Sequence, residues 1–379
     1  MRHVPSRPRP RLVYAASERD ADILYPTRFL APDPFLFVQK GGRRTIMLSD
    51  LEVDRARRQA SVDRVVSWSR MAARVERRGE QASPAAVVGE ALRALGIRRA
   101  EVPWTFPAGL AGELEAAGVR LTVGPEPFWP ERAIKSPEEI RAIESALRAA
   151  EAGVAAGIEA LRSCRVARDG FLRRDGRLFT AEDLRAAIDM RVIAEGAIPQ
   201  HTICAPGDQA VDPHAVGHGP IRAHVPIVVD VFPRSAGTGY FGDISRTIVR
   251  GRGPERLKEV YGLVSEAVDL GFSRLREGAS GQAIHREIHD LFVRRGYPTG
   301  LRDGRRQGFF HGTGHGLGLD LHEGPSISSR PAILRAGHVV TVEPGLYYLG
   351  LGGVRIEDVA VVGKLRARNL TRAPRVLEV

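Results

Sequence analysis

The feature of this sequence that most constrains its fold is a pattern that occurs twice. Each copy predicts two helices followed by two strands, and each strand carries one acidic residue. The copies span residues 136–250 and 254–362, and the two acids of a copy lie 13 and 14 residues apart. They share no obvious sequence similarity, so the symmetry is one of predicted structure. If the copies pack face to face, four carboxylates meet at one centre: Asp230, Asp243, Glu343 and Glu357.

Local signals predict where the elements of the two copies begin. Ser136 is a good helix N-cap, Pro137 suits the first helical position and Glu139 completes a capping box, so a long helix to about Arg162 follows. Thr180 opens a second helix. Continuous Val/Ile runs predict buried strands. The remaining expected elements are helices at 181–195, 254–277 and 282–295, and strands at 226–232, 243–249, 338–343 and 353–362.

A proline-rich segment at 124–130 predicts a linker between two domains, residues 1–130 and 131–379. The first domain is expected to be mixed α/β, with a hairpin, two helices and a short strand. It has no cluster of histidines or acids, so we expect it to shape or cover the site, or to dimerise. Its predicted elements are strands 35–38 and 45–48, helices 84–95 and 109–117, and strand 119–123.

Three histidines lie among glycines between His311 and Glu323. A helix does not tolerate that glycine density, because each glycine loses backbone entropy on ordering. Histidine titrates near neutral pH and is the commonest metal ligand in proteins. The segment therefore predicts a loop or strand edge that forms one side of an active site.

An acid within a Val/Ile strand is costly to bury alone. Four such acids next to a histidine-rich loop repel each other unless positive charge lies between them. Two divalent cations would supply that charge, and a pair of metals can also activate a water and polarise a carbonyl. Carboxylates with one imidazole suit Mn, Co, Fe or Zn, and the pattern contains no thiolate.

Five segments in order resemble the pita-bread metallopeptidases, which include methionine aminopeptidase, aminopeptidase P and prolidase. They span residues 136–362. The resemblance implies an α+β pita-bread catalytic domain with pseudo-two-fold symmetry. Residues 1–130 resemble, more weakly, the smaller α/β creatinase-like domain of the proline-specific members. The matching segments are Asp230, 239–247, 311–323, 342–347 and 355–358.

The resemblance also implies a role for each site residue. Asp230 would hold one metal ion, Asp243 and Glu357 would bridge both, and the second ion would be held by His315 and Glu343. Glu343 would also move a proton to or from a bridging hydroxide that attacks the peptide. Residues on the substrate side would be His214, His311, His322 and Arg355, with His322 stabilising the tetrahedral intermediate.

The implied function is hydrolysis of the bond between an amino-terminal residue and a following proline. The enzyme would be a Xaa-Pro dipeptidase or aminopeptidase with two divalent metal ions, of which Mn is favoured. It is expected to be cytoplasmic and homodimeric. The sequence does not separate these two subclasses. Alternatives on the same fold are a methionine aminopeptidase-like or creatinase-like hydrolase, or a non-catalytic relative that binds RNA or protein. Two departures from the family are a longer turn at Ser235–Gly239 and a basic, loop-like insert at 163–179.

The composition of the chain limits the classes of protein to which it can belong. The net charge of +11 is carried almost wholly by arginine, since the chain has only four lysines. These arginines are scattered and few aromatics lie among them, so we do not expect a nucleic-acid surface. No apolar run reaches membrane-spanning length. The basic amino-terminal segment, with Arg2 and Arg7, lacks the apolar stretch of a signal peptide. The two cysteines, Cys164 and Cys204, are expected to be reduced and partly buried.

Two further motifs resemble functional sites, but we do not expect either of them to be one. His285 and His289 lie four residues apart on a predicted helix, but no third ligand is near in sequence, so we expect a surface pair or one with ordinary hydrogen bonds. The Gly312–Gly316 segment superficially resembles a nucleotide-binding loop. It does not open a helix and has no downstream ribose-binding acid, which argues against a dinucleotide site.

Overall fold

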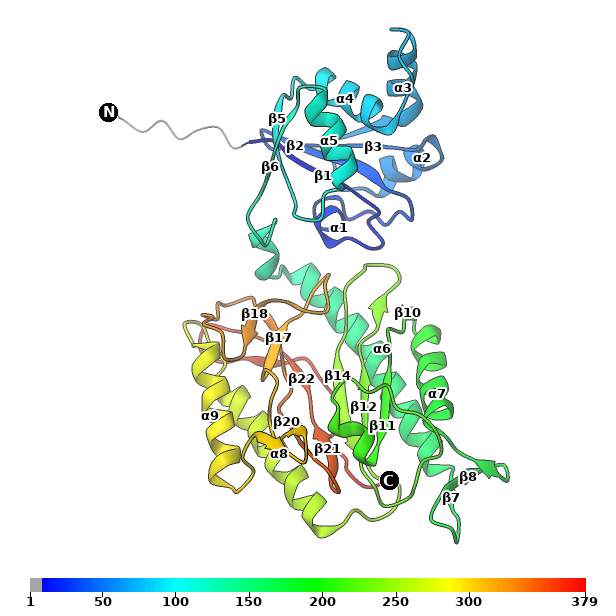
Figure 1. Ribbon diagram of the computed structural model, residues 1–379, viewed down its shortest axis with the longest axis vertical. Helices are drawn as coiled ribbons and strands as arrows, with labels where there is room; N and C mark the ends of the chain where they lie inside the picture. The colour runs from blue at the N-terminus through cyan, green and yellow to red at the C-terminus, as the bar shows by residue number, and fades with distance from the viewer. Residues whose placement is uncertain (1–8) are drawn as a thin grey trace. The chain divides into compact units, whose positions relative to one another are not determined.

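The computed structural model describes residues 9–379, and the chain divides into two compact units, one ending at Arg132 and the other running from Ala133 to Val379 (Figure 1). Residues 1–8, which include Arg2 and Arg7, lie outside the described residues. Within the described part, no helix is both long and apolar enough to cross a membrane.

The first unit is built on a six-stranded mixed sheet in the order β4-β3-β2-β1-β5-β6 (Figure 1). The predicted hairpin, strand and two helices are confirmed as β2, β3, β6, α4 and α5, whereas the other elements were not predicted. The strands are β1 Arg11–Ala15, β2 Phe35–Lys40, β3 Arg43–Leu48, β4 Arg64–Ser67, β5 Arg99–Val102 and β6 Arg120–Val123. The helices are α1 Ala21–Thr27, α2 Asp50–Gln59, α3 Trp68–Glu76, α4 Pro84–Ala94 and α5 Ala108–Ala116.

Strand alternation gives this sheet two apolar faces. Along β2, Leu36 and Val38 contribute to one core cluster, while Phe35 and Phe37 contribute to another. Successive side chains of a strand point to opposite faces, so each cluster occupies one face. Residues of α3, α4 and α5 belong to the first cluster, and residues of α1 and α2 to the second. Helices therefore cover both faces.

The second unit contains two pairs of helices with strands between them (Figure 1). Its helices are α6 Pro137–Arg162, α7 Ala181–Ala194, α8 Glu255–Arg274 and α9 Gly281–Arg294, and its 3₁₀ turn η2 is Gly207–Val211. The strands of its main sheets are β11 Ile203–Pro206, β12 Ile227–Val231, β14 Ile244–Ile248, β17 Gly314–Gly316, β18 Glu323–Ile327, β19 Val339–Val342, β20 Gly345–Tyr348, β21 Gly352–Arg355, β22 Asp358–Val361 and β23 Arg368–Asn369.

The helices of this unit confirm the predicted pattern. Ser136 and Glu139 form the expected capping box at the start of α6. Gly153 and Gly157 let α6 approach α7 closely, since a β-carbon at Gly153 would lie 2.9 Å from Val192 Cγ2. The helix α6 also packs against β12 and β14, so it supports the strands that carry the first pair of acids.

The two strand pairs are present but differ in regularity. In the first, β12 is antiparallel to β14, with Asp230 directly opposite Ser245. In the second, β19 is antiparallel to β22. The single strand predicted at 353–362 is wrong, because it is two strands, β21 and β22, which belong to different sheets. Glu357 lies in the break, where its backbone N–H donates to the carbonyl of Ser245 in β14, a strand of another sheet.

The basic insert at 163–179 is also not the loop we predicted. It forms a small three-stranded sheet of β7 Arg165–Val166, β8 Leu172–Arg174 and β9 Arg177–Leu178. Asp175 and Gly176 both have positive φ, 51° and 80°, between the paired residues Arg174 and Arg177. An Asp-Gly pair in this conformation forms the tight turn that two-residue hairpins favour, and Leu172 is fully buried beneath it.

Candidate metal centre

One cavity of about 570 Å³ in the second unit brings together every site residue that the sequence predicted. Both strand pairs, the glycine-histidine segment and the loop after η2 contribute to it. The predicted residues that line it are Asp230, Asp243, His315, Glu343, Glu357, His214, His311, His322 and Arg355. Apolar side chains complete the lining, among them Ile203, Phe232, Phe310 and Leu321.

Ser245 connects the two pairs of acids. Its Oγ lies 2.8 Å from Asp230 Oδ1 and 3.1 Å from Glu357 Oε2. A hydroxyl has one proton to donate, so it serves one of these carboxylates at a time. Ser245 lies in β14, two residues beyond Asp243, which directly precedes that strand. The sequence analysis gave Ser245 no role, although this period-two spacing could have indicated one.

Arg355 is the cation of this cluster and is 3% exposed. Its Nη2 donates to Asp230 Oδ2 at 2.7 Å, its Nε to Ser245 Oγ at 2.9 Å, and its Nη1 to the Tyr347 hydroxyl at 3.0 Å. The sequence placed Arg355 in the substrate pocket. The structure adds that its guanidinium orients a predicted metal ligand, and it shows Tyr347 as a second residue that the sequence analysis assigned no role.

His315 directs one ring nitrogen at the acids. Its Nε2 is 3.4 Å from Glu343 Oε1 and 3.6 Å from Asp243 Oδ2. Its Nδ1 is 3.1 Å from the Gly316 carbonyl, an acceptor that requires Nδ1 to carry the proton. Nε2 is then left with a lone pair that faces the carboxylates. A ring held in this way is typical of metal-ligating histidines.

Glycine at position 314 allows this arrangement. A β-carbon there would overlap the Thr341 carbonyl on the adjacent strand β19. The amide of His315 donates to Thr341 Oγ1 at 3.1 Å, so the close approach also fixes the position of the histidine backbone. Gly314 therefore lets this segment lie directly against β19, the strand that Glu343 follows.

The buried acids carry more negative charge than the side chains around them can balance. Burial, reinforced by neighbouring carboxylates, raises the pKa of Asp243 and of Glu357 well above the ordinary range. Burial likewise raises the pKa of Glu343 to about 7, with Arg355 opposing the shift. Each increase reflects the cost of keeping a charged carboxylate out of water. A divalent cation among these oxygens would remove that cost.

The donor atoms themselves fit a cation. Glu357 Oε1 is a buried carboxylate oxygen without a hydrogen-bond partner among residues 9–379. One ligand atom each from Asp243, His315 and Glu357 lies within 4.8 Å of the others. Two carboxylates and an imidazole suit Mn, Fe, Co or Zn. The residues present therefore fit the divalent metal that the sequence predicted at this position.

The three other predicted histidines differ in their surroundings. His322 is exposed at the cavity, and its ring meets that of His315 edge to face with centroids 4.3 Å apart. His214 is also exposed, on the loop after η2. His311 is enclosed: its Nδ1 is 2.7 Å from the Gly312 carbonyl and its Nε2 is 2.9 Å from the Tyr347 hydroxyl. Burial lowers the pKa of His311 to about 3, so it is neutral at physiological pH.

The histidines and cysteines that we predicted to lie outside the functional site have ordinary structural surroundings. His285 Nδ1 is 3.0 Å from Thr313 Oγ1, so this histidine has an ordinary hydrogen bond, and burial lowers its pKa. His289 faces its neighbour Asp290 at 3.7 Å. Both cysteines are free thiols, and both are buried.

Comparison with known proteins identifies the family. A family model described as "Metallopeptidase family M24" matches residues 141–364, which is more than half of the chain and includes every residue predicted to bind metal. The chain belongs to metallopeptidase family M24.

Relatives of this M24 protein support the same assignment. It is 32% identical over 248 residues to a Xaa-Pro dipeptidase of Pyrococcus horikoshii, covering 65% of this chain and 64% of the relative. It is 41% identical over 140 residues to an uncharacterised peptidase, YqhT, of Bacillus subtilis, covering 37% of each. The matches thus span between about a third and two thirds of these curated relatives.

A solved structure extends the likeness to both units. The crystal structure of the prolidase from Pyrococcus horikoshii matches this M24 chain with a TM-score of 0.78 and 26% identity. The match covers 97% of this chain and 95% of that one. The α+β pita-bread fold with a preceding amino-terminal domain, expected from the sequence, is therefore confirmed.

Proposed function

We propose that this M24 protein is a dinuclear-metal exopeptidase that hydrolyses the bond between an amino-terminal residue and a following proline. The observation that carries the proposal is the convergence of four acids and His315 on one cavity, where Glu357 Oε1 is buried without a partner. The similarity to a Xaa-Pro dipeptidase supports the choice of substrate. We also propose that the two compact units are separate domains, the second of them catalytic.

The five ligands would divide between two ions, with two of the ligands shared. Asp230 would hold one ion, Asp243 and Glu357 would be shared, and His315 with Glu343 would hold the other. Divalent ions at this position supply Lewis acidity, which lowers the pKa of a water and polarises a carbonyl. Manganese is the identity we favour, because carboxylate oxygens outnumber nitrogen donors.

The chain's own residues would handle the proton and the substrate. Glu343, which lines the cavity beside His315, would accept a proton and return it to the leaving amine. His322 lies exposed at the cavity beside His315 and would donate a hydrogen bond to the oxygen of the scissile carbonyl. His214, from the opposite loop, would contact the substrate from the second side.

Proline at the second position explains why such a pocket would be needed. A Xaa-Pro bond has no amide N–H, so a peptidase cannot bind it through that donor. Contacts with His214, His322 and the apolar lining would replace the missing hydrogen bond. Arg355, which lines the same cavity, would hold Asp230 and the Tyr347 hydroxyl in position through its hydrogen bonds.

The proposal is tested by removing and restoring metal. Protein stripped with a chelator should not cleave Xaa-Pro dipeptides, and manganese should restore cleavage, while the matched Xaa-Ala dipeptide is cleaved far more slowly. Asp243→Asn should not be restored, whereas Asp290→Asn, an exposed acid outside the cavity, should behave as the wild type. Cleavage that survives chelation, or none with any divalent metal, would overturn the proposal.

Substrate length then separates the subclasses. A dipeptidase cleaves Xaa-Pro in preference to Xaa-Pro-Yaa, and an aminopeptidase has the opposite preference. Equal and efficient cleavage of Met-Ala-Yaa peptides would instead support a methionine aminopeptidase-like activity. Rates on the three substrates at equal metal loading decide among these outcomes.

A further inference from the structure

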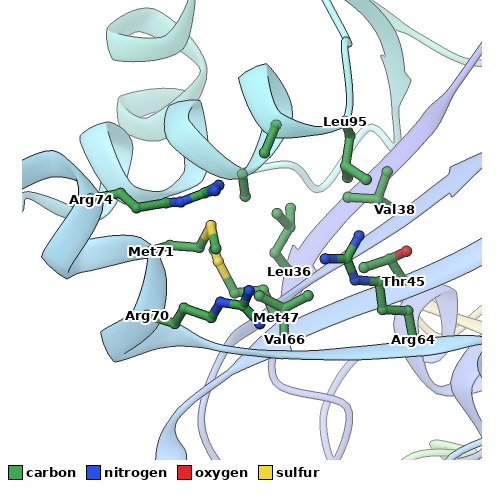
Figure 2. A pocket seen from close by; sticks show the side chains of 12 residues that line it. Leu36, Val38, Thr45, Met47, Arg64, Val66, Arg70, Met71, Arg74 and Leu95 are labelled. Carbon is green, nitrogen blue, oxygen red and sulfur yellow. The ribbon is translucent and has the colours of Figure 1, made fainter.

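The first unit contains a cavity of about 170 Å³ between the β4 edge of its sheet and the helices α3 and α4 (Figure 2). Every residue that lines it lies between Leu36 and Leu95, so it shares no residue with the metal centre. Its floor is apolar and buried, whereas its mouth carries three arginines. This combination of a dry floor and a charged mouth is what distinguishes it from an ordinary packing defect.

Strand register builds the floor. Residues directly opposite on neighbouring strands share a face of the sheet, and β2, β3 and β4 are neighbours. Their pairing produces two rows of side chains: Val38, Thr45 and Arg64 in one, and Leu36, Met47 and Val66 in the other. Met71 of α3 and Ala91 of α4, both buried, form the sides. The result is a slot in which aliphatic and thioether side chains form the buried base and the arginine side chains supply much of the accessible surface.

Three guanidinium groups approach this slot from different elements. Arg64 comes from β4, and Arg70 and Arg74 lie four residues apart on α3, hence on one helix face. Figure 2 shows their side chains directed towards the space above Leu36 and Met47. Arg74 Nη1 is 3.7 Å from Glu90 Oε1, so its charge is partly balanced.

The other two arginines are not balanced. Neither the Arg64 nor the Arg70 guanidinium makes an ion pair or a hydrogen bond to another residue in the described range 9–379. Both side chains are exposed, so water solvates them when the cavity is empty. An anion between the two groups would offset their mutual repulsion, and guanidinium groups bind carboxylates with two parallel hydrogen bonds.

Size and charge together define the ligand. A cavity of about 150 Å³ lined by apolar side chains accommodates benzene, so the slot of about 170 Å³ fits an apolar group of that size. A bare phosphate or sulfate would leave the floor unused. A free amino acid brings an ammonium group that three arginines would repel. The chemistry therefore selects a small acid with an apolar body and no positive charge.

We propose that this cavity binds a small organic carboxylate with a compact aromatic or branched aliphatic body. The body lies on Leu36 and Met47, and the carboxylate lies at the mouth between Arg64 and Arg70. Thr45, whose side-chain hydroxyl is beside Arg64 in the floor, offers one further donor. Ligand binding in this cavity is independent of the proposed peptidase activity. Free amino acids and peptides carry a charged amine, so they are disfavoured ligands here.

Titration calorimetry on the full-length protein at low salt tests the proposal with phenylacetate and 4-methylpentanoate as probes. We expect one site per chain with a dissociation constant of about 1 mM or tighter, given the few atoms of such ligands. Phenylalanine, 2-phenylethanol and inorganic phosphate should each bind at least about tenfold more weakly, because each lacks one of the required features.

Variants locate the site. Arg64→Gln and Arg70→Gln should each weaken phenylacetate binding about tenfold, the loss of one charge-assisted interaction. Arg58→Gln removes the same charge from an exposed position of α2 outside the cavity and should leave binding unchanged. Ala94→Trp, at an exposed cavity-lining position where folding is not at risk, should block binding without lowering the melting temperature.

Two results would overturn the proposal. One is the absence of heat or of ligand-induced chemical shifts at about 10 mM of either carboxylate, roughly tenfold above the expected dissociation constant. The other is binding that the Arg64→Gln/Arg70→Gln double variant and Ala94→Trp leave as strong as in the wild type, since that would place the ligand elsewhere.

Discussion

Arg355 and Asp230 form a buried ion pair at the edge of the acid cluster. Arg355 Nη2 donates to Asp230 Oδ2 at 2.7 Å, and the two side chains are 4% and 14% exposed. The pair places one positive charge among four acids before any metal is considered. It also fixes the carboxylate of Asp230, because one oxygen faces Arg355 and the other faces Ser245.

Removing Arg355 should destabilise the metal-free protein strongly. Arg355→Met leaves Asp230 buried without its cation, which costs on the order of 3–5 kcal/mol in the free energy of unfolding. Manganese should restore part of that loss by supplying positive charge to the same acids. Urea unfolding with and without manganese measures both effects, with Arg306→Met at an exposed position as the control. Equal stability of Arg355→Met and wild type without metal would contradict the pairing.

The contribution of Tyr347 to stability and to kcat should come from its hydroxyl alone. That hydroxyl accepts from Arg355 Nη1 and, because His311 Nδ1 carries the proton, donates to His311 Nε2. Tyr347→Phe keeps the ring and leaves these buried groups unpaired, at a cost of about 1–3 kcal/mol, and should lower kcat about tenfold through displaced site residues. Tyr348→Phe is a matched control, since among residues 9–379 the Tyr348 hydroxyl bonds only to the Pro298 carbonyl, outside the cavity. Similar kinetics for the two variants would count against this role.

Lys135 should hold the segment that carries His322. Its ammonium pairs with Glu323, the residue after His322, and the two side chains are 2% and 11% exposed. Lys135→Met leaves a carboxylate buried without that cation and should cost on the order of 3–5 kcal/mol. The double variant Lys135→Met/Glu323→Gln should regain much of the lost stability. A double-mutant cycle from chemical unfolding measures the coupling, and purely additive losses would show that the pair is not coupled.

His338 should make stability depend on pH. Its Nδ1 accepts the Arg335 amide at 3.0 Å, and protonation would remove that acceptor. Burial, with Lys135 and Arg335 nearby, lowers the pKa of His338 to about 4. The unfolded chain binds the proton near pH 6.5, so the stabilisation is complete above that pH and is lost as pH falls towards about 4.

The matched variant for this effect is His338→Asn, whose side-chain oxygen keeps an acceptor near Nδ1 but does not titrate. The difference in unfolding free energy between wild type and variant should shrink by on the order of 1 kcal/mol between pH 7 and pH 4. A difference that stays constant over this range would show that His338 is not the titrating group.

Much of the site could be predicted because its chemistry is visible in strand sequences. Asp230 and Asp243 interrupt Val/Ile runs, and a buried acid in such a run needs a partner. His315 lies in a glycine-rich segment that neither a helix nor a packed core would require. These local signals group the acids with the histidine-rich segment, whereas His214 and Arg355 were assigned to the site through the family resemblance.

The unpredicted features depend on contacts between distant parts of the chain. The break at Glu357 interrupts an apolar run without glycine or proline, and it arises because Glu357 bonds to Ser245 and its carbonyl accepts from Arg246 Nη1. Nothing in the sequence indicates that Arg355, which lines the cavity as expected, also pairs with Asp230. The small sheet in the basic insert is different, since its Asp175-Gly176 pair is a local signal for a tight turn.

The most direct test of the central claim is a count of bound manganese together with the rate of Xaa-Pro hydrolysis as metal is added to stripped protein. We expect activity to rise with loading and to level off at two ions per chain, and Asp243→Asn to bind fewer ions and remain inactive. Full activity without metal, or saturation of Asp243→Asn at two ions with wild-type rates, would contradict it.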